Sequence, residues 1–104
     1  MICVEITKKN NQVSAIKISG HSGYAESGSD IVCAAVSSIV TTSINGILSF
    51  KETIQVTKPE NPLEMKVIEY DEITSVLIDN MLTLLKEVEK EYKKYIRMEE
   101  KHEC

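Results

Sequence analysis

The sequence predicts a single α+β domain over residues 1–104, with the element order ββαββα and a four-stranded sheet packed against two helices. Two pairs of short segments with strand patterns are each followed by a segment with a helical pattern. The chain has 104 residues, a length typical of one domain. Since 42% of the residues are hydrophobic, the chain has enough apolar side chains to form a core.

The first two strands are expected to form a hairpin. Residues 2–7 alternate between apolar and polar side chains, which is the period of a half-buried strand. A second strand is expected over residues 13–19, with Ile16 and Ile18 on its buried face. Residues 9–11 predict the turn, because asparagine tolerates the positive φ angles of tight turns.

The amino-acid composition changes after the hairpin. Residues 20–30, GHSGYAESGSD, carry three of the four glycines, so backbone freedom is concentrated in one loop. A buried helix is expected from Ile31 to about Ser49, with Ser29 or Asp30 as its N-cap. Its core-facing residues are predicted to be Val32, Val36, Ile39, Val40, Ser43 and Ile47. Gly46 costs the helix up to ~1 kcal/mol relative to alanine, which suggests close approach to a neighbouring strand.

The second half of the chain repeats the pattern. Ile54 and Val56 mark a third strand, KPENP at 58–62 is a turn, and residues 66–70 are expected to complete the sheet. A long amphipathic helix capped by Asp71 should follow. Its apolar positions are Ile73, Leu77, Met81, Leu84, Val88, Tyr92 and Tyr95. At about 28 residues this helix spans ~42 Å, more than the diameter of such a domain. Its C-terminal end is therefore expected to project or to pack on a partner, which predicts a homodimer.

Charge and composition exclude several classes of protein. A net charge of -4 and a pI near 5.2 argue against direct nucleic-acid binding and suit a basic partner. Residues 1–10 lack the pattern of a signal peptide, and no run reaches the ~18 apolar residues of a membrane span. We therefore expect a cytoplasmic protein with no membrane contact.

The three cysteines, Cys3, Cys33 and Cys104, form no CxxC pair, so no disulfide framework, metal site or cofactor is predicted.

His21 and Cys33 stand at the two ends of the glycine-rich loop. A helix N-terminus can stabilise a thiolate at Cys33, and the imidazole of His21 can take the thiol proton and later deliver it to a leaving amine. Backbone N–H groups at the helix start could form an oxyanion hole. The alternative is structural, because a cysteine near a helix start is often a small buried hydrophobe. Cys3 and Cys104 have no comparable setting.

Residues 20–38, GHSGYAESGSDIVCAAVSS, resemble the signature of the ribosomal-processing cysteine protease family Prp. In that family a GHxGY segment leads through a glycine loop to DIVCAAVS. The resemblance implies an endopeptidase that removes a short N-terminal extension from a large-subunit ribosomal protein precursor, the L-series protein twenty-seven. The cut would follow an aromatic pair and precede a small residue, with His21 as general base and Cys33 as nucleophile. Ser27 departs from the expected pattern, which puts the substrate contacts of the loop in doubt.

Two further residues have open roles in this interpretation. Asp30 either orients His21 in a triad-like set or caps the helix. Ser37 lies one turn after Cys33, where its hydroxyl contacts the thiolate or the loop, or bonds back to a helix carbonyl.

The loop itself is expected to act as a lid that orders on substrate. The candidate substrate-loop residues are Gly20, Gly23, Tyr24, Glu26 and Gly28. Tyr24 either stacks on an aromatic substrate residue or pins the loop. Glu26 either contacts a basic substrate tail or is a solvated surface residue.

Two other functions compete with a protease. A glycine-rich loop that enters a helix is a natural phosphate site, but the loop lacks the GxxxxGKS/T and GxGxxG spacings and Asp30 would repel phosphate. A non-enzymatic ribosome-assembly adaptor could use the long helix as its docking surface.

Overall fold

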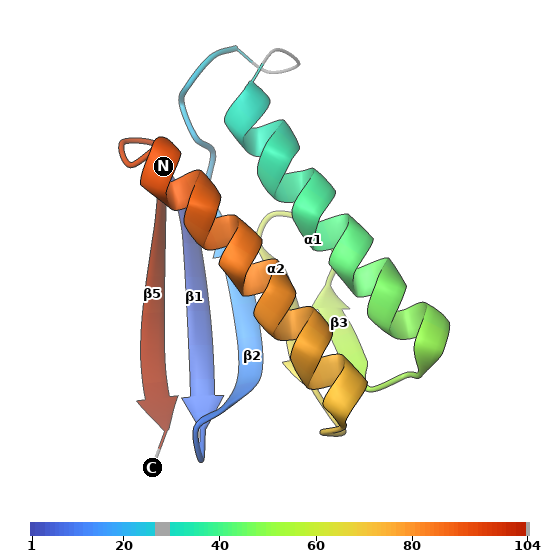
Figure 1. Cartoon of the computed structure of the whole chain (residues 1–104). Coiled ribbons are helices and arrows are strands. Elements are labelled where there is room, and N and C mark those ends of the chain that lie inside the picture. The colour runs from blue at the N-terminus through green and yellow to red at the C-terminus, as the bar shows by residue number, and fades with distance from the viewer. Residues whose placement is uncertain (27–29, 104) are drawn as a thin grey trace.

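A computed structural model describes residues 1–26 and 30–103 of the chain. Two helices cover one face of a five-stranded mixed sheet, so the domain has two layers (Figure 1). The elements in chain order are β1 (Ile2–Lys9), β2 (Gln12–Ser19), α1 (Ile31–Phe50), β3 (Ile54–Lys58), β4 (Leu63–Val67), α2 (Glu72–Glu91) and β5 (Ile96–Glu103). The α+β class is confirmed, and the order is ββαββαβ.

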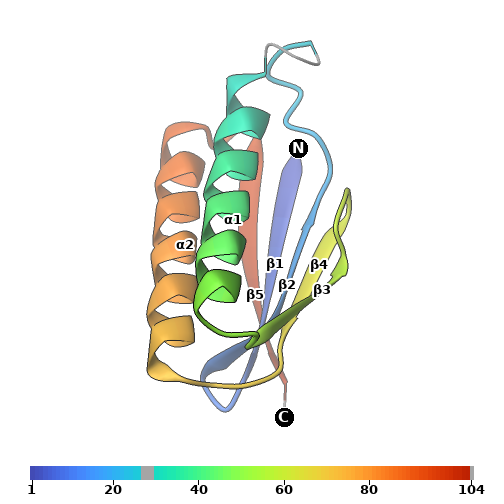
Figure 2. The ribbon, with the colours of Figure 1, turned by 90° about the vertical axis from the view of Figure 1, so that its right-hand side faces the viewer.

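The strands lie in the order β3-β4-β2-β1-β5. The predicted hairpin is confirmed, because β1 and β2 pair antiparallel and Asn10 and Asn11 at the turn both have positive φ. β4 pairs antiparallel with both β2 and β3, whereas β5 runs parallel to β1 at the edge of the sheet. Figure 2 shows α1 and α2 side by side on the same face.

The core lies between the helices and this face of the sheet. The strand pattern predicted for residues 2–7 is confirmed, since Ile2, Val4 and Ile6 are buried while the residues between them are only half-buried. Helix α1 contributes Val32, Val36, Val40, Ile44 and Ile47, and α2 contributes Thr74, Ile78, Met81 and Leu85.

Helix α1 carries no charged residue. Among the helices in the described residues, α1 alone has the length and apolar composition that could cross a membrane, a pattern that the core helix of a soluble protein also gives. Its buried face here lies against the sheet. The close approach expected at Gly46 is wrong, because a Cβ atom added at Gly46 would meet no heavy atom of another element within 4 Å.

The last third of the chain differs most from the prediction. The helix ends at Glu91 and not near residue 98, and the backbone N–H of Tyr92 bonds the Val88 carbonyl as the helix stops. Residues 96–103 then form β5, a fifth strand where four were predicted. Ile96 at the start of β5 is only 1% exposed. The helical spacing of Tyr92 and Tyr95 misled the prediction, because both side chains lie in the turn before β5.

The fourth strand is also displaced from its predicted position. β4 covers residues 63–67 and not 66–70, and its Met65 is 1% exposed beneath the helices. Ile68 is 59% exposed, and its N–H bonds the carbonyl of Thr53 beyond the end of the ladder. Ile68 and Tyr70 therefore lie outside the strand, and their apolar character did not indicate strand structure.

Candidate active site

Gly20 sets the direction in which the chain leaves β2. Its φ is +87°, and a Cβ atom there would lie 2.3 Å from the carbonyl oxygen of Met1. A side chain at this position would collide with backbone beside β1, so only glycine fits. The next residue, His21, is exposed at the end of the sheet where the loop begins.

Cys33 is the third residue of α1 and is half-buried. His21 and Cys33 both line a cavity of about 350 Å³ between α1 and the β3–β4 turn. Both also line a second cavity of about 520 Å³ on the loop side, together with Asp30. Ser37 faces both cavities as well. The fold therefore places His21 and Cys33, the predicted base and the predicted nucleophile, along the same two cavities.

Asp30 is the N-cap of α1. Its Oδ1 accepts hydrogen bonds from the backbone N–H groups of Val32 and Cys33, each at 3.0 Å, and its Oδ2 accepts one from the Ser22 hydroxyl. The Ser22 bond is the largest cause that lowers the pKa of Asp30 from 3.8 to about 2, followed by the Cys33 N–H, with the Cys33 thiol contributing further. The capping role is thus observed. The carboxylate bonds Ser22 and the helix start, and an orienting role toward His21 stays a prediction.

The cap changes what the helix start can do. Because Val32 and Cys33 donate their N–H groups to Asp30, these donors are not open to a substrate oxygen in this arrangement. Two of the N–H groups expected to form an oxyanion hole are therefore occupied by the Asp30 carboxylate. The same occupancy argues against a phosphate site, since anion and carboxylate would compete for the same donors.

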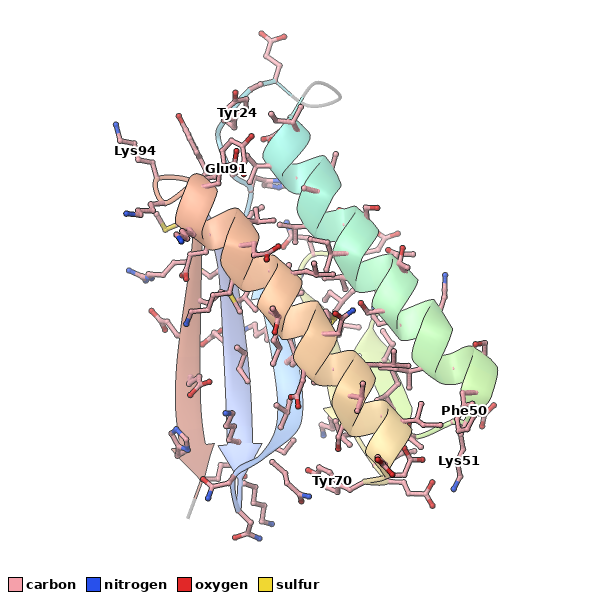
Figure 3. The ribbon with its side chains drawn as sticks, in the orientation of Figure 1. Tyr24, Phe50, Lys51, Tyr70, Glu91 and Lys94 are labelled. Carbon is pink, nitrogen blue, oxygen red and sulfur yellow. The ribbon has the colours of Figure 1, made fainter. Side chains whose placement is uncertain are left out.

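Ser22 and Tyr24 hold the described part of the loop. Ser22 is 4% exposed, and its hydroxyl accepts the Tyr24 N–H at 3.1 Å while donating to Asp30. The Tyr24 ring packs edge-on against Tyr92 and Tyr95, with centroid distances of 5.7 and 5.1 Å. Figure 3 shows Tyr24 at the C-terminal end of α2. This geometry supports the pinning interpretation of Tyr24, and sequence reasoning missed Ser22.

The remaining loop residues are placed only in part. Gly23 has a φ of +72° and lines the loop-side cavity, and Glu26 is exposed. Gly28, with Ser27 and Ser29, lies outside the described residues, as does Cys104. Cys3 lies on β1, and it and Cys33 are free thiols.

Sequence reasoning also missed Asn61, in the turn before β4. Its Oδ1 accepts the Gly20 N–H at 3.0 Å, and its Nδ2 lies 3.4 Å from the Gly20 carbonyl and 3.3 Å from His21 Nε2. The pairing of β2 with β4 explains this contact, because Ile18 opposes Leu63 and two further steps of the same register bring Gly20 to Asn61. The signal that could have found Asn61 is thus the strand register.

Comparison with protein families adds a decisive observation to this geometry. The family model described as Cysteine protease Prp matches residues 1–97. The chain belongs to this family. It is therefore a cysteine protease of the Prp type.

Individual relatives agree over nearly the full chain. The ribosomal processing cysteine protease Prp of Staphylococcus aureus is 29% identical over 103 residues, covering 94% of this chain and 97% of the relative. The protein of the same name from Bacillus subtilis is 25% identical over 108 residues, covering 94% and 96%.

Solved structures of Prp have the same fold. The S. aureus protease with a covalently linked product peptide matches with a TM-score of 0.88 at 27% identity, over 97% of this chain and 100% of that one. The S. aureus protease with a substrate peptide matches with a TM-score of 0.82 at 26% identity over the same shares.

Proposed function

We propose that this protein is an endopeptidase that removes a short N-terminal extension from a ribosomal protein precursor, with Cys33 as nucleophile and His21 as general base. The observation that carries the proposal is the shared lining of two cavities by His21 and Cys33. The relatives from S. aureus and B. subtilis are ribosomal processing cysteine proteases, which supports the substrate class. The L-series protein twenty-seven is the precursor that the sequence resemblance implies.

The chemistry needs one thiol and one proton carrier. The Cys33 sulfur attacks the scissile carbonyl carbon and forms a carbon–sulfur bond with it. The thiol proton passes to the His21 ring in the same step. The peptide C–N bond then breaks, and His21 delivers the proton to the leaving amine. Water, deprotonated by His21, hydrolyses the thioester and restores the thiol.

The cavity between α1 and the β3–β4 turn suits an apolar substrate side chain. Its apolar lining consists of Ile2, Ile18, Val36, Val40, Pro59 and Leu63. A volume of about 350 Å³ is at the small end of ligand pockets and accommodates an aromatic ring. This agrees with a cut after an aromatic pair. Glu60, which lines this cavity, and Glu26 in the loop place negative charge where a basic substrate tail would approach.

The supporting residues keep narrower roles in this proposal. Asp30 fixes the start of α1, because its carboxylate accepts the backbone N–H of Cys33, and the Cys33 thiol also helps to lower the pKa of Asp30. Ser37 faces the reacting groups from one turn further along α1. Gly20, Gly23 and Gly28 give the substrate loop its backbone freedom.

The homodimer predicted from the sequence remains a proposal, but its first argument, a projecting end of the long helix, no longer applies. The helix end that was to project is replaced by β5, which packs along β1. Exposed apolar residues on α2, including Val76 at 58% exposure, are the remaining support.

The test follows the mass of the ribosomal protein precursor during incubation with the protein. We expect loss of the N-terminal extension, a fall of at least about 10⁴-fold in rate for Cys33→Ala, and a strong slowing for His21→Ala. Cys3→Ala is the matched control, since this thiol lies on β1, and it should cleave at the native rate. Cleavage that survives Cys33→Ala would overturn the assignment.

A further inference from the structure

Ser22, the residue after His21, is buried although its neighbours in the loop are exposed. Only 4% of Ser22 is exposed, whereas Gly20, His21 and residues 23–26 all lie at the surface. A buried hydroxyl costs free energy unless it is hydrogen-bonded. The Ser22 hydroxyl is bonded twice, because it donates to Oδ2 of Asp30 and accepts the N–H of Tyr24 at 3.1 Å. The loop is therefore fixed at this residue.

Asp30 extends this contact to the nucleophile. One carboxylate oxygen of Asp30 accepts the Ser22 hydroxyl, although the two residues are eight positions apart in sequence. The other oxygen accepts the backbone N–H groups of Val32 and Cys33, each at 3.0 Å. A short path of hydrogen bonds thus joins the residue next to His21 to the backbone of Cys33, and this path crosses the loop between them.

The other hydrogen bond of the Ser22 hydroxyl leads to the C-terminal end of α2. Tyr24, whose N–H this hydroxyl accepts, packs its ring edge-on against Tyr92 and Tyr95. The carbonyl of Tyr95 accepts the N–H of Ile2 at the start of β1, at 2.8 Å. The loop is thus anchored both to the start of α1 and to the turn before β5, and the Ser22 hydroxyl lies between the two anchors.

We propose that Ser22 is a positioning residue whose hydroxyl, through Asp30, holds the loop end that carries His21 in a fixed place relative to Cys33. The proposal rests on the proposed function, in which His21 is the base and Cys33 the nucleophile. The described residues that line the two cavities do not include Ser22, so it acts on the reaction through other residues. Its effect is large enough to measure, because a misplacement of about 1 Å between reacting groups can slow a reaction about 100-fold.

Two serine substitutions separate this role from the general loss of a hydrogen bond. Ser22→Ala removes the hydroxyl and both of its bonds. Ser14→Ala is the matched control, because the Ser14 hydroxyl also donates a hydrogen bond, to the carbonyl of Thr7 at 3.1 Å. Ser14 lies on β2 and does not line either cavity. Both variants therefore lose the same group, and only one of them loses it beside the active site.

The first measurement needs no activity. Amide exchange followed by NMR reports how firmly Asp30 holds the N–H groups of Val32 and Cys33. In Ser22→Ala these two amides should exchange at least about fivefold faster than in the native protein, because the carboxylate has lost the bond that fixes its other oxygen. The amide of Thr74, which the N-cap of α2 bonds at 2.8 Å, should be unchanged. Unchanged exchange at Val32 and Cys33 would overturn the proposal.

The second measurement separates kcat from KM in peptide cleavage, per folded molecule. Ser22→Ala should lower kcat about tenfold and change KM less than about twofold, because the reacting groups are displaced and the groups that bind substrate are not. Ser14→Ala should change neither. A native kcat in Ser22→Ala, or a rise in KM alone, would make Ser22 a structural or substrate-binding residue and would contradict the proposal.

A further variant tests the same bond from its other end. Asp30→Ser keeps a residue that caps helices well, but it leaves no second oxygen for Ser22. Because Ser22 acts through Asp30, the double variant Ser22→Ala/Asp30→Ser should have a kcat close to that of Asp30→Ser alone. Losses that multiply in the double variant would show that Ser22 acts by another route, against the proposal.

Failure of this proposal differs from failure of the proposed function. If Cys33→Ala is inactive and Ser22→Ala keeps the native kcat, the proposed function holds and the positioning role is wrong. If Cys33→Ala cleaves at the native rate, the proposed nucleophile is wrong and the positioning role falls with it, whatever the amide exchange shows.

Discussion

The starts of the two helices are built alike and differ in what lies opposite them. Each helix has an aspartate N-cap, Asp30 or Asp71, whose carboxylate bonds the backbone N–H of the third helical residue. That residue is Cys33 in α1 and Thr74 in α2, and its side chain also helps to lower the pKa of the capping carboxylate in both helices. The capping geometry is therefore not what makes one site a candidate for catalysis.

The difference lies in burial and in the neighbouring side chain. Thr74 is 3% exposed, and its hydroxyl bonds the hydroxyl of Thr53, which is fully buried. Cys33 is half-buried between two cavities that it shares with His21. The Asp71 cap thus lies beside a buried hydrogen bond between two threonine hydroxyls. The Asp30 cap lies beside a half-buried thiol that lines two cavities. Comparing the two separates the stabilising role of the cap from the chemistry beside it.

A thiol placed at the second helix start gives the largest expected contrast. Thr74→Cys should react with iodoacetamide at least about 100-fold more slowly than Cys33, because a buried thiol reacts only after local opening. Mass spectrometry of labelled peptides against time measures both rates in one protein, and Cys33→Ser serves as the control for assigning the signals. Equal rates at the two positions would break the comparison.

Removing the Thr74 hydroxyl should cost stability and leave chemistry intact. Thr74→Val keeps the shape but leaves the Thr53 hydroxyl buried without this partner, which should lower the free energy of unfolding by about 1–3 kcal/mol. Urea unfolding measures the loss, and peptide cleavage per folded molecule should stay at the native value.

The double variant Thr53→Val/Thr74→Val sharpens this result. With both hydroxyls gone no polar atom is stranded, so the double variant should be more stable than Thr74→Val alone. A double variant less stable than the single one would show that the hydroxyl pair itself carries the stability.

The smallest expected effect is a difference in acid sensitivity. The pKa of Asp30 is lowered from 3.8 to about 2, chiefly by Ser22, and that of Asp71 is lowered by the Thr74 N–H and hydroxyl. A carboxyl with a lower pKa in the folded state binds fewer protons than in the unfolded chain. Its contribution is therefore present above about pH 4 and is lost as the pH falls toward 2.

Substitution by asparagine tests this, because asparagine also caps helices well but does not titrate. Asp30→Asn and Asp71→Asn should each flatten the fall in urea midpoint between about pH 4 and pH 2. Asp30→Asn should flatten it more, since Ser22 and the Cys33 thiol add to its bonds. Identical pH dependence in the two variants and the native protein would contradict the assigned bonds.

The sequence was sufficient where a local pattern decides the structure. The alternation of residues 2–7, the Asn10–Asn11 turn and the Asp71 cap are all confirmed, because each depends on neighbours within a few residues. The position of β5 was not accessible in this way. Its stability comes from pairing with β1, some ninety residues earlier in the chain, and the helical spacing of Tyr92 and Tyr95 concealed the turn.

The candidate site divides along the same line. His21 and Cys33 were expected to lie near each other because they flank a single glycine-rich loop, and both line the same two cavities. Ser22 and Asn61 were not predicted, because their roles depend on contacts with Asp30 and with the end of β2 that only the folded chain makes. Two of the expected oxyanion donors at the start of α1, the N–H groups of Val32 and Cys33, are already bonded to the Asp30 carboxylate that caps the helix.

The parallel pairing of β1 with β5 has a consequence for when the enzyme becomes competent. Ile2 lines the groove beside His21, and its N–H is held by the carbonyl of Tyr95. On the ribosome, residues 2–9 emerge long before residues 96–103, and translation of the intervening chain takes on the order of 5 to 20 s. One edge of β1 therefore stays unpaired until β5 has been synthesised. A nascent chain can cap its helices early, but the groove beside His21 is completed only after codons 96–103 have been read and β5 has paired with β1.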